Sequence, residues 1–222
     1  MTGAEWGLER RAPSSGDRKE KFRYHELYFR KPTLKSVATL PVDEMSTQKN
    51  VRQQAGTVEE PEALRLDQEK VEQIVDALNT DLAATYVLYH QIKKHHWNVE
   101  GSEFLDVHEF LGEAAYDLET AADEIAERAQ ALGGVPIAGG KNLEEAAPVE
   151  PEGNDVYDIR TSLHNDMEMC GDVIETLREH VELTHNLGDH ATAELLRQKL
   201  LEVEELAHHL EHYLEDDSLK DW

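Results

Sequence analysis

The sequence predicts an all-α protein, an antiparallel four-helix bundle with one long crossover. Four segments carry apolar residues at steps of three and four, the period of a helix that buries one face. A short break, a long connection rich in Gly and Pro, and a second short break separate them. Short connections join antiparallel neighbours, whereas a long one carries the chain across the bundle. The 222 residues are enough for one or two domains.

The first two predicted helices are separated by a break at Gly101, and the second is stopped by Gly133 and Gly134. The first apolar stripe comprises Ile74, Leu78, Leu82, Thr85, Tyr89, Ile92 and His96. The second comprises Phe104, Val107, Leu111, Ala115, Leu118, Ala122, Ile125, Ala129 and Leu132.

The connection over 133–154 is the predicted crossover, and residues 142–147 within it suit a short helix of one or two turns. The last two helices are separated by a break at Gly188, after which Asp189 can cap the final helix. The third stripe comprises Val156, Ile159, Leu163, Met167, Cys170, Val173, Leu177, Val181 and Thr184. The fourth comprises Leu196, Leu200, Val203, Leu210 and Leu214.

Residues 1–63 show no sustained period and are punctuated by Pro and Gly, which predicts a disordered or weakly ordered N-terminal extension. The bundle is therefore expected over 64–216, followed by a C-terminal tail at 217–222. The distribution of charged residues changes at residue 44, before the end of this extension. Residues 1–44 contain nine Lys and Arg against seven Asp and Glu, and the remainder contains thirteen against forty. Either 1–44 lies upstream of a natural start at Met45, or it is a genuine basic arm.

The acidity of the bundle argues against binding of polyanions, so DNA binding is not expected of it. It fits a halophilic protein, because salt screens the repulsion over a few ångströms. The lone Cys170 excludes an internal disulfide framework and is expected to be a small buried apolar group. No apolar run is long enough to predict a membrane span, and no apolar signal core precedes the bundle, so a cytoplasmic location is expected.

Two histidines and two carboxylates form a candidate metal site. His96 and His108 flank the break at Gly101, and Asp123 and Glu127 are four residues apart on one helical face. Imidazole and carboxylate together suit iron and other first-row divalent metals. The other histidines at 90, 95, 164 and 180 lack this spacing and are expected to have no ligand role.

The four ligands are not expected to meet within one chain. Asp123 lies fifteen residues after His108, about 22 Å along a helix at 1.5 Å per residue, whereas a metal ligand lies about 2 Å from its ion. A two-fold axis between antiparallel copies of the second helix would bring the histidines of one subunit to the carboxylates of its partner.

The combined motif resembles that of the Dps family of mini-ferritins. It consists of the run His96-Trp97-Asn98, then Gly101, Phe104 and His108, and finally Asp123 with Ala126-Glu127-Arg128 and Leu132-Gly133-Gly134. The resemblance covers roughly 64–216 and is strongest to acidic haloarchaeal members. It implies a ferritin-like bundle that assembles as a dodecameric cage, a homo-oligomer that oxidises Fe(II) with hydrogen peroxide and stores ferric mineral.

Carried over to this chain, the resemblance implies a di-iron site at the subunit interface that handles Fe(II) and Fe(III). His96 and His108 would come from one subunit, and Asp123 and Glu127 from its neighbour, with Glu127 as a bridge. Trp97 would lie near the centre. The family usually carries an acid four residues after the second histidine, where this chain has Gly112, which places the second iron position in doubt. Glu113 is adjacent in sequence but about 100° around the helix.

Other histidine and acid patterns compete with this site. Glu182 with His185 and Glu205 with His208 repeat the Glu-x-x-His spacing of larger ferritins, but their positions place them about 20 Å apart along antiparallel helices. His208, His209 and His212 either chelate a surface metal through the i, i+4 pair or form a solvated acidic face. In the Dps family, three-fold pores near the start of the last helix are lined with acids, so the resemblance implies that Asp189 and Glu194 line an iron-entry pore. A nucleoid-binding structural protein that uses the basic arm is the rival function.

Overall fold

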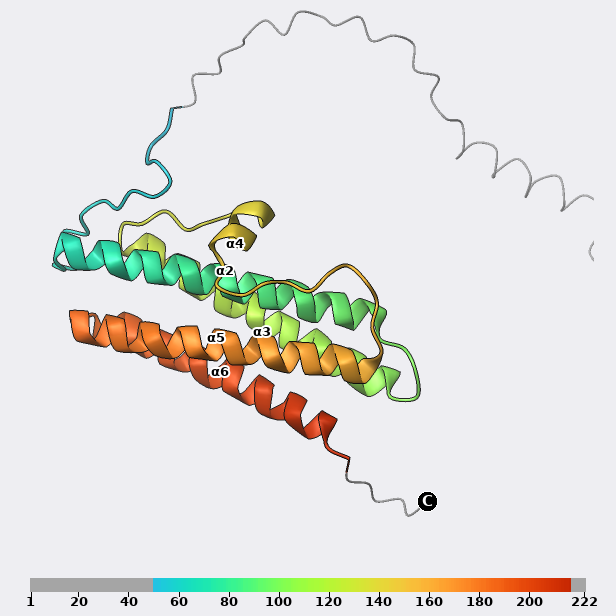
Figure 1. Cartoon of the computed structure of the whole chain (residues 1–222). Helices are drawn as coiled ribbons and strands as arrows, with labels where there is room; N and C mark the ends of the chain where they lie inside the picture. The colour runs from blue at the N-terminus through green and yellow to red at the C-terminus, as the bar shows by residue number, and fades with distance from the viewer. Residues whose placement is uncertain (1–49, 217–222) are drawn as a thin grey trace, which may run out of the picture. The chain divides into compact units, whose positions relative to one another are not determined.

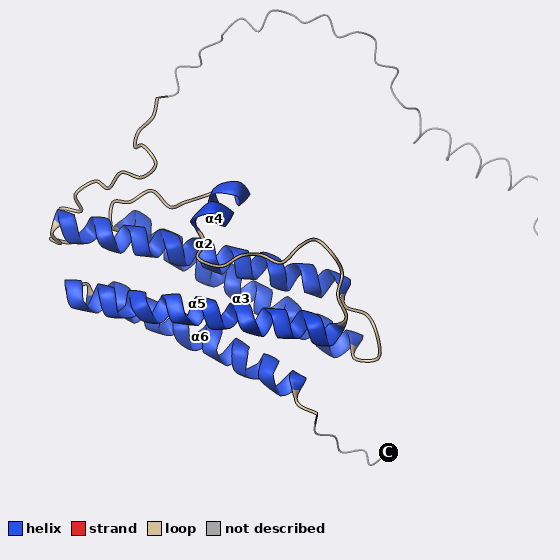
Figure 2. Cartoon of the chain, in the orientation of Figure 1, coloured by secondary structure: helices blue, strands red, loops and turns tan. Residues whose placement is uncertain are grey.

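The structure is a computed structural model that describes residues 50–216, and these residues form helices joined by loops (Figures 1 and 2). The four long helices are α2 (Gln68–Asn98), α3 (Phe104–Ala131), α5 (Ile159–Leu187) and α6 (His190–Leu214). A short helix, α4 (Gly140–Ala146), lies in the crossover between α3 and α5. The prediction of an all-α bundle with a short helix in its crossover is therefore confirmed. No helix within 50–216 is long and apolar enough to span a membrane.

The long helices pack antiparallel to their neighbours (Figure 1). α2 packs against α3, α5 and the short α4, and α5 packs along α6. Long-range side-chain pairs fix the directions: His95 near the end of α2 meets Asp166 near the start of α5, and Arg128 near the end of α3 meets Asp189 at the start of α6. Each end of the bundle therefore combines helix starts with helix ends.

The core is built from the predicted stripes. The fully buried large side chains include Ile74, Leu78, Leu111, Ile125, Leu177, Leu196 and Leu210. Cys170 is buried, and burial together with the charge of Asp166 raises the pKa of its thiol, which leaves it unreactive as expected. Two stripe positions were wrong, because Phe104 is 43% exposed and Val156 is 61% exposed. Phe104 begins α3 and Val156 precedes α5, so neither has a full helical turn packed around it.

Carboxylate caps define where three helices begin. Asp67 accepts from the backbone N–H groups of Glu69 and Lys70 at the start of α2, and Asp158 accepts from that of Thr161 at the start of α5. Asp189 caps α6 as predicted, directly after Gly188 ends α5 with φ 89° in the left-handed region. Each cap satisfies N–H groups that have no partner within the helix.

The N-terminal extension is described only from residue 50 onward, so most of 1–63, the whole of 1–44 and the tail at 217–222 lie outside the described residues. Residues 50–63 contain no helix or strand but contact the end of α3. Gln53 Nε2 and the backbone N–H of Glu59 both donate to the carbonyl of Gly133, at 2.7 and 2.9 Å. A Cβ at Gly133 would lie 2.0 Å from the Glu59 carbonyl oxygen, so only glycine permits this approach. The boundary at residue 63 stays a prediction.

Candidate metal centre

His96 and His108 meet across the turn between α2 and α3. His96 lies in the last turn of α2 and His108 in the second turn of α3, and Gly101 turns the chain between them with φ 125°. The two half-buried rings stack with centroids 3.9 Å apart and planes inclined by 19°. The sequence prediction that these two residues share one end of the bundle agrees with this geometry.

The hydrogen bonds of the pair engage Nδ1 on both residues, and neither Nε2 has a hydrogen-bond partner among residues 50–216. His96 Nδ1 lies 2.7 Å from the His108 carbonyl oxygen, and His108 Nδ1 lies 2.8 Å from the His96 carbonyl oxygen. A carbonyl only accepts, so each Nδ1 carries the hydrogen and donates it. In the neutral imidazole, Nε2 then holds the lone pair, and this arrangement of a histidine held through its other nitrogen is typical of metal ligands.

The absence of a side chain at Gly112 leaves room for the His96 ring. A Cβ at residue 112 would lie 3.1 Å from His96 Cε1 and 3.3 Å from His96 Nδ1, closer than most such contacts. Any side chain at residue 112 would therefore press on the ring. This chain has Gly112 where an acid was expected from the resemblance, and that position lies beside the imidazole of His96.

An open hollow beside the two rings is lined by acidic and aromatic side chains. Glu113 and Asp117, both exposed on α3, line it together with His96, His108, Glu109, Gly112 and Tyr116. Glu113 therefore shares the hollow with the histidines although it lies off their helical face. Glu109, Glu113 and Asp117 are the acids that line this hollow.

Asp123 and Glu127 lie far from the histidines. Both carboxylates are exposed, and neither forms a hydrogen bond or ion pair with another residue of the described chain. His108 and Asp123 belong to the same continuous helix, so about 22 Å of helix axis separates them. Within 50–216, no three His, Cys, Asp or Glu side chains come together as a metal-binding group. The four candidate ligands therefore do not come together within residues 50–216 of one chain.

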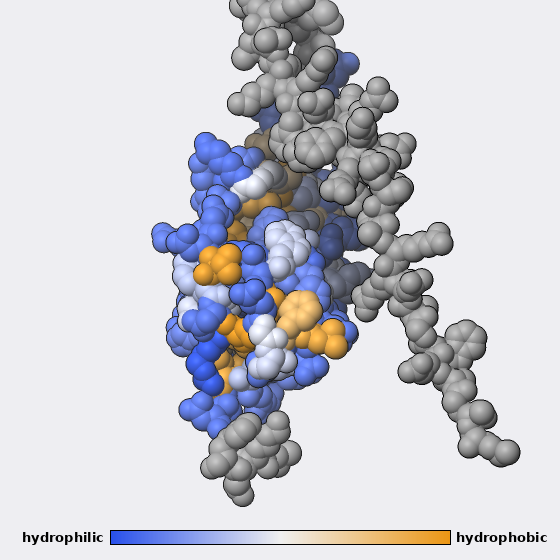
Figure 3. All heavy atoms as spheres, turned by 90° about the vertical axis from the view of Figure 1, so that its right-hand side faces the viewer, coloured by the Kyte–Doolittle hydropathy of each residue, from blue (hydrophilic) through white to orange (hydrophobic). Residues whose placement is uncertain are grey.

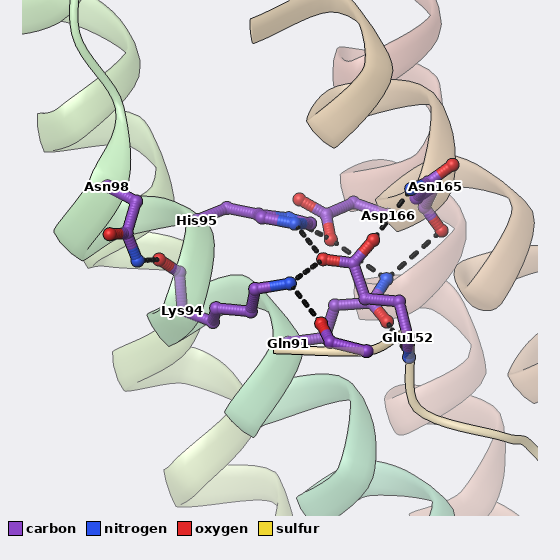
Figure 4. Close-up of polar contacts among 8 residues, drawn as sticks. Gln91, Lys94, His95, Asn98, Glu152, Asn165 and Asp166 are labelled. Carbon is purple, nitrogen blue, oxygen red and sulfur yellow. Dashed lines mark hydrogen bonds and ion pairs between the residues drawn. The ribbon is translucent and has the colours of Figure 1, made fainter. Parts of the chain in front are cut away.

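His95, the neighbour of His96, points into a buried polar cluster formed with residues of the crossover and α5 (Figure 4). Its Nδ1 lies 2.8 Å from Asp166 Oδ1 on α5, and its Nε2 contacts Glu152 of the crossover. Glu152 also accepts from Lys94 Nζ and Asn165 Nδ2, both at 2.6 Å. Three segments, α2, the crossover and α5, are therefore bound together directly behind the metal-ligand candidate.

The cluster favours a charged His95. Burial alone would lower the pKa of His95, but the hydrogen bond and charge of Asp166, with those of Glu152, raise it above its usual value. Burial likewise opposes ionisation of Glu152, but its bonds to Lys94, Asn165 and His95 lower its pKa. A second buried pair joins His180 Nδ1 to Asp81 Oδ1 at 2.7 Å. Neither pairing was predicted, and the only signal in the sequence is that Asp81 and Asp166 stand next to the stripe residues Leu82 and Met167.

The pore prediction needs one correction. Asp189 is 3% exposed, and both of its oxygens lie 2.9 Å from Arg128 Nη2. It also accepts from the backbone N–H of Thr192, and these partners lower its pKa despite the opposing effect of burial. A carboxylate engaged in this way joins α3 to α6 and does not line a pore. Glu194 is exposed and stays a prediction.

The two competing Glu-x-x-His motifs, at Glu182 to His185 and Glu205 to His208, also lie far from each other. His185 lies near the end of α5, where its ring centroid is 5.0 Å from that of His190 at the start of α6. Glu205 lies fifteen residues beyond His190 in α6, about 22 Å along the axis. The two motifs therefore occupy different levels of the bundle.

Comparison with known proteins agrees with this architecture. A family model described as the ferritin-like domain matches residues 75–219. The DNA protection during starvation protein of Halobacterium salinarum is 65% identical over 175 residues, which are 79% of this chain and 96% of that protein. The nutrient stress-induced DNA-binding protein of a Synechococcus species is 38% identical and covers 72% of this chain and 92% of its own length.

Solved structures give the same result. The crystal structure of an archaeal Dps homologue from Halobacterium salinarum matches with a TM-score of 0.76 and 64% identity, over 79% of this chain and 98% of that one. A Dps protein from Vibrio cholerae matches with a TM-score of 0.64 and 29% identity, over 68% of this chain and 94% of that one. The latter is described as a member of a broad superfamily of ferritin-like diiron-carboxylate proteins.

Proposed function

Because the chain belongs to the Dps family of ferritin-like proteins, we propose that it is a ferroxidase and an iron-storage protein. In this proposal, it oxidises Fe(II) with hydrogen peroxide or oxygen, stores the ferric mineral inside a dodecameric cage, and protects the cytoplasm from iron-driven oxidative damage. The observation that carries the proposal is the stacked pair of His96 and His108, whose Nδ1 atoms are both engaged and whose Nε2 atoms have no hydrogen-bond partner among residues 50–216.

The site is proposed to be completed by Asp123 and Glu127 of a second subunit. If two α3 helices run antiparallel so that His108 of one meets the carboxylate pair of the other, the two-fold axis passes near residue 116, midway between them. Tyr116 occupies this position and is 70% exposed. An aromatic side chain on the axis would pack against its own copy, and each dimer would contain two equivalent sites.

Exposed apolar side chains around the histidines support burial of this end of the bundle against another subunit. Trp97 is 68% exposed, Leu105 is 60% exposed, and Phe104 stacks on His108 with ring centroids 5.1 Å apart. Figure 3 views the bundle from the side of the α2–α3 turn, where apolar side chains lie at the surface among hydrophilic ones. Large exposed apolar groups beside a polar site are typical of interfaces.

The proposed chemistry follows from holding two Fe(II) ions together as substrate. His96 and His108 supply neutral nitrogen ligands, Asp123 and Glu127 of the partner subunit supply negative charge, and Glu113 is available for the second ion in place of an acid at residue 112. Two Fe(II) ions give up two electrons to one peroxide, which takes up two protons and leaves as two waters. A pair of ions therefore avoids the one-electron reduction that releases hydroxyl radical.

Anaerobic titration with Fe(II) followed by peroxide tests the proposal. We expect binding that saturates in proportion to the number of subunits, and about two Fe(II) oxidised per peroxide, since the sites act on pairs. His96→Ala should remove the saturable phase, whereas His164→Ala, which changes an exposed histidine on α5, should not. Slow oxidation with no saturable phase in the unchanged protein would contradict the proposal.

The names of the relatives keep the rival function open, because they describe DNA protection in one protein and DNA binding in another. In this chain, residues 45–222 carry thirteen basic against forty acidic side chains, so phosphate contacts would depend on residues 1–44. We expect residues 45–222 alone not to shift duplex DNA at any salt concentration. A shift by the full chain that disappears with salt and with removal of 1–44 would support the rival function.

A further inference from the structure

Two histidines near the end of α6 converge on one face of that helix, and neither of them lines the hollow beside His96 and His108. His208 and His212 are one helical turn apart on the same face. Their Nε2 atoms lie 3.1 Å from each other, and their ring centroids are 4.3 Å apart with planes inclined by 68°. Both residues are exposed, and the side chain of His208 is 60% exposed.

The separation of the two Nε2 atoms matches that of a chelating pair. Ligand nitrogens lie about 2.0–2.1 Å from a divalent ion such as zinc, so two nitrogens in neighbouring positions lie roughly 2.8–3.4 Å apart, with octahedral geometry at the short end of this range and tetrahedral geometry at the long end. The observed 3.1 Å falls within this range without any change of rotamer. If both imidazoles are neutral, the Nε2–H of one ring donates to the Nε2 of the other, and only one of the two nitrogens offers a lone pair. A bound cation would accept a lone pair from both Nε2 atoms.

We propose that His208 and His212 form an accessory binding site for a first-row divalent cation. Imidazole nitrogen suits zinc, copper, iron and nickel, and exposed positions leave room for water as the remaining ligands. The site is distinct from the one proposed at the α2–α3 turn and shares no residue with it.

The electrostatic surroundings favour a cation at this position. Residues 200–216 contain six acidic side chains and no Lys or Arg. Three of the acids, Glu202, Glu204 and Asp216, pair with Lys199, Arg178 and Arg160, so the favourable charge comes from the other three acids. Glu211 Oε2 lies 3.8 Å from His208 Nδ1, on the side of the ring away from His212. A distance of 3.8 Å is too long for a hydrogen bond, so this carboxylate contributes negative charge beside the histidine pair and does not fix its tautomer.

Calorimetric titration with Ni²⁺ tests the site in the full chain. The starting protein carries His96→Ala and His108→Ala, so that the histidines of the proposed ferroxidase site do not contribute. We expect one Ni²⁺ site per subunit, and further substitution of His212→Gln should weaken it by at least about tenfold. The matched control is His209→Gln, because His209 is exposed but lies about 100° around α6 from His208.

Equal Ni²⁺ affinity in the His212→Gln and His209→Gln proteins would overturn the proposal. If the doubly substituted protein does not assemble, the unchanged chain gives an independent measurement by modification with diethyl pyrocarbonate. Ni²⁺ should then protect His208 and His212 but not His209, and equal modification of all three would also overturn the proposal. His212→Gln should leave iron oxidation intact, so failure of this site and failure of the proposed ferroxidase are distinguishable.

Discussion

Assembly of a mixture of His96→Ala and Asp123→Ala subunits is expected to restore about one quarter of the ferroxidase sites, although each variant alone is inactive. In a mixed two-fold dimer, one site combines both substitutions, and the other combines an intact histidine pair with an intact carboxylate pair. With equal amounts and random pairing, half of the dimers are mixed and half of their sites are whole. The physical reason is the 22 Å of α3 that separates the half-sites, about 1.5 Å for each of fifteen residues.

The measurement is the initial rate of Fe(II) oxidation after the subunits are unfolded together and reassembled. Subunits carrying different affinity tags report how many mixed assemblies form. The control is a mixture of His96→Ala with His108→Ala, which damages the same half-site in both partners and should regain nothing. Proven mixed assembly without recovered activity would show that the site lies within one chain.

The fold was predictable because each long helix buries one face, and the regular spacing of apolar residues in the sequence identifies that face. The stripes predicted burial wrongly only at Phe104 and Val156. The spacing of apolar residues does not show that α3 starts at Phe104 or that α5 starts after Val156. The caps at Asp67 and Asp158 follow from local chemistry. The contacts of Gln53 and Glu59 with Gly133 do not, since they join residues about 80 positions apart.

The meeting of His96 and His108 was predictable, but the interactions that support the pair were not. The spacing of His96 and His108 across Gly101 indicated a pair, yet the carbonyl bonds that fix their tautomers depend on how closely α2 and α3 pack. His95 and His96 are neighbours with no local difference between them. Only the position of Asp166, 71 residues later, makes one a buried partner and leaves the other facing the hollow.

The buried cluster behind His96 is expected to contribute strongly to stability. Asp166→Ala should lower the free energy of unfolding by about 3–5 kcal/mol, the usual cost of removing one partner from a buried ion pair. Asp166 is fully buried, and its loss leaves the Nδ1 of His95 without this partner in a site that is 3% exposed, with only Glu152 as an acidic contact. Urea unfolding followed by circular dichroism, at one subunit concentration, measures the change.

The matched control is Asp172→Ala, which removes an exposed carboxylate from the same helix and should stay within about 0.5 kcal/mol of the unchanged protein. The pH dependence separates charge from packing. The folded-state pKa of His95 is raised above its unfolded value of about 6.5, so the stability it contributes is present below that value and is lost as pH rises through the folded pKa. The difference between the unchanged protein and Asp166→Asn, which keeps the shape but not the charge, should therefore be largest near neutral to mildly acidic pH and shrink in alkali. A difference that is constant with pH would mean that the cluster holds the last turn of α2 by packing and neutral hydrogen bonds, with His95 uncharged.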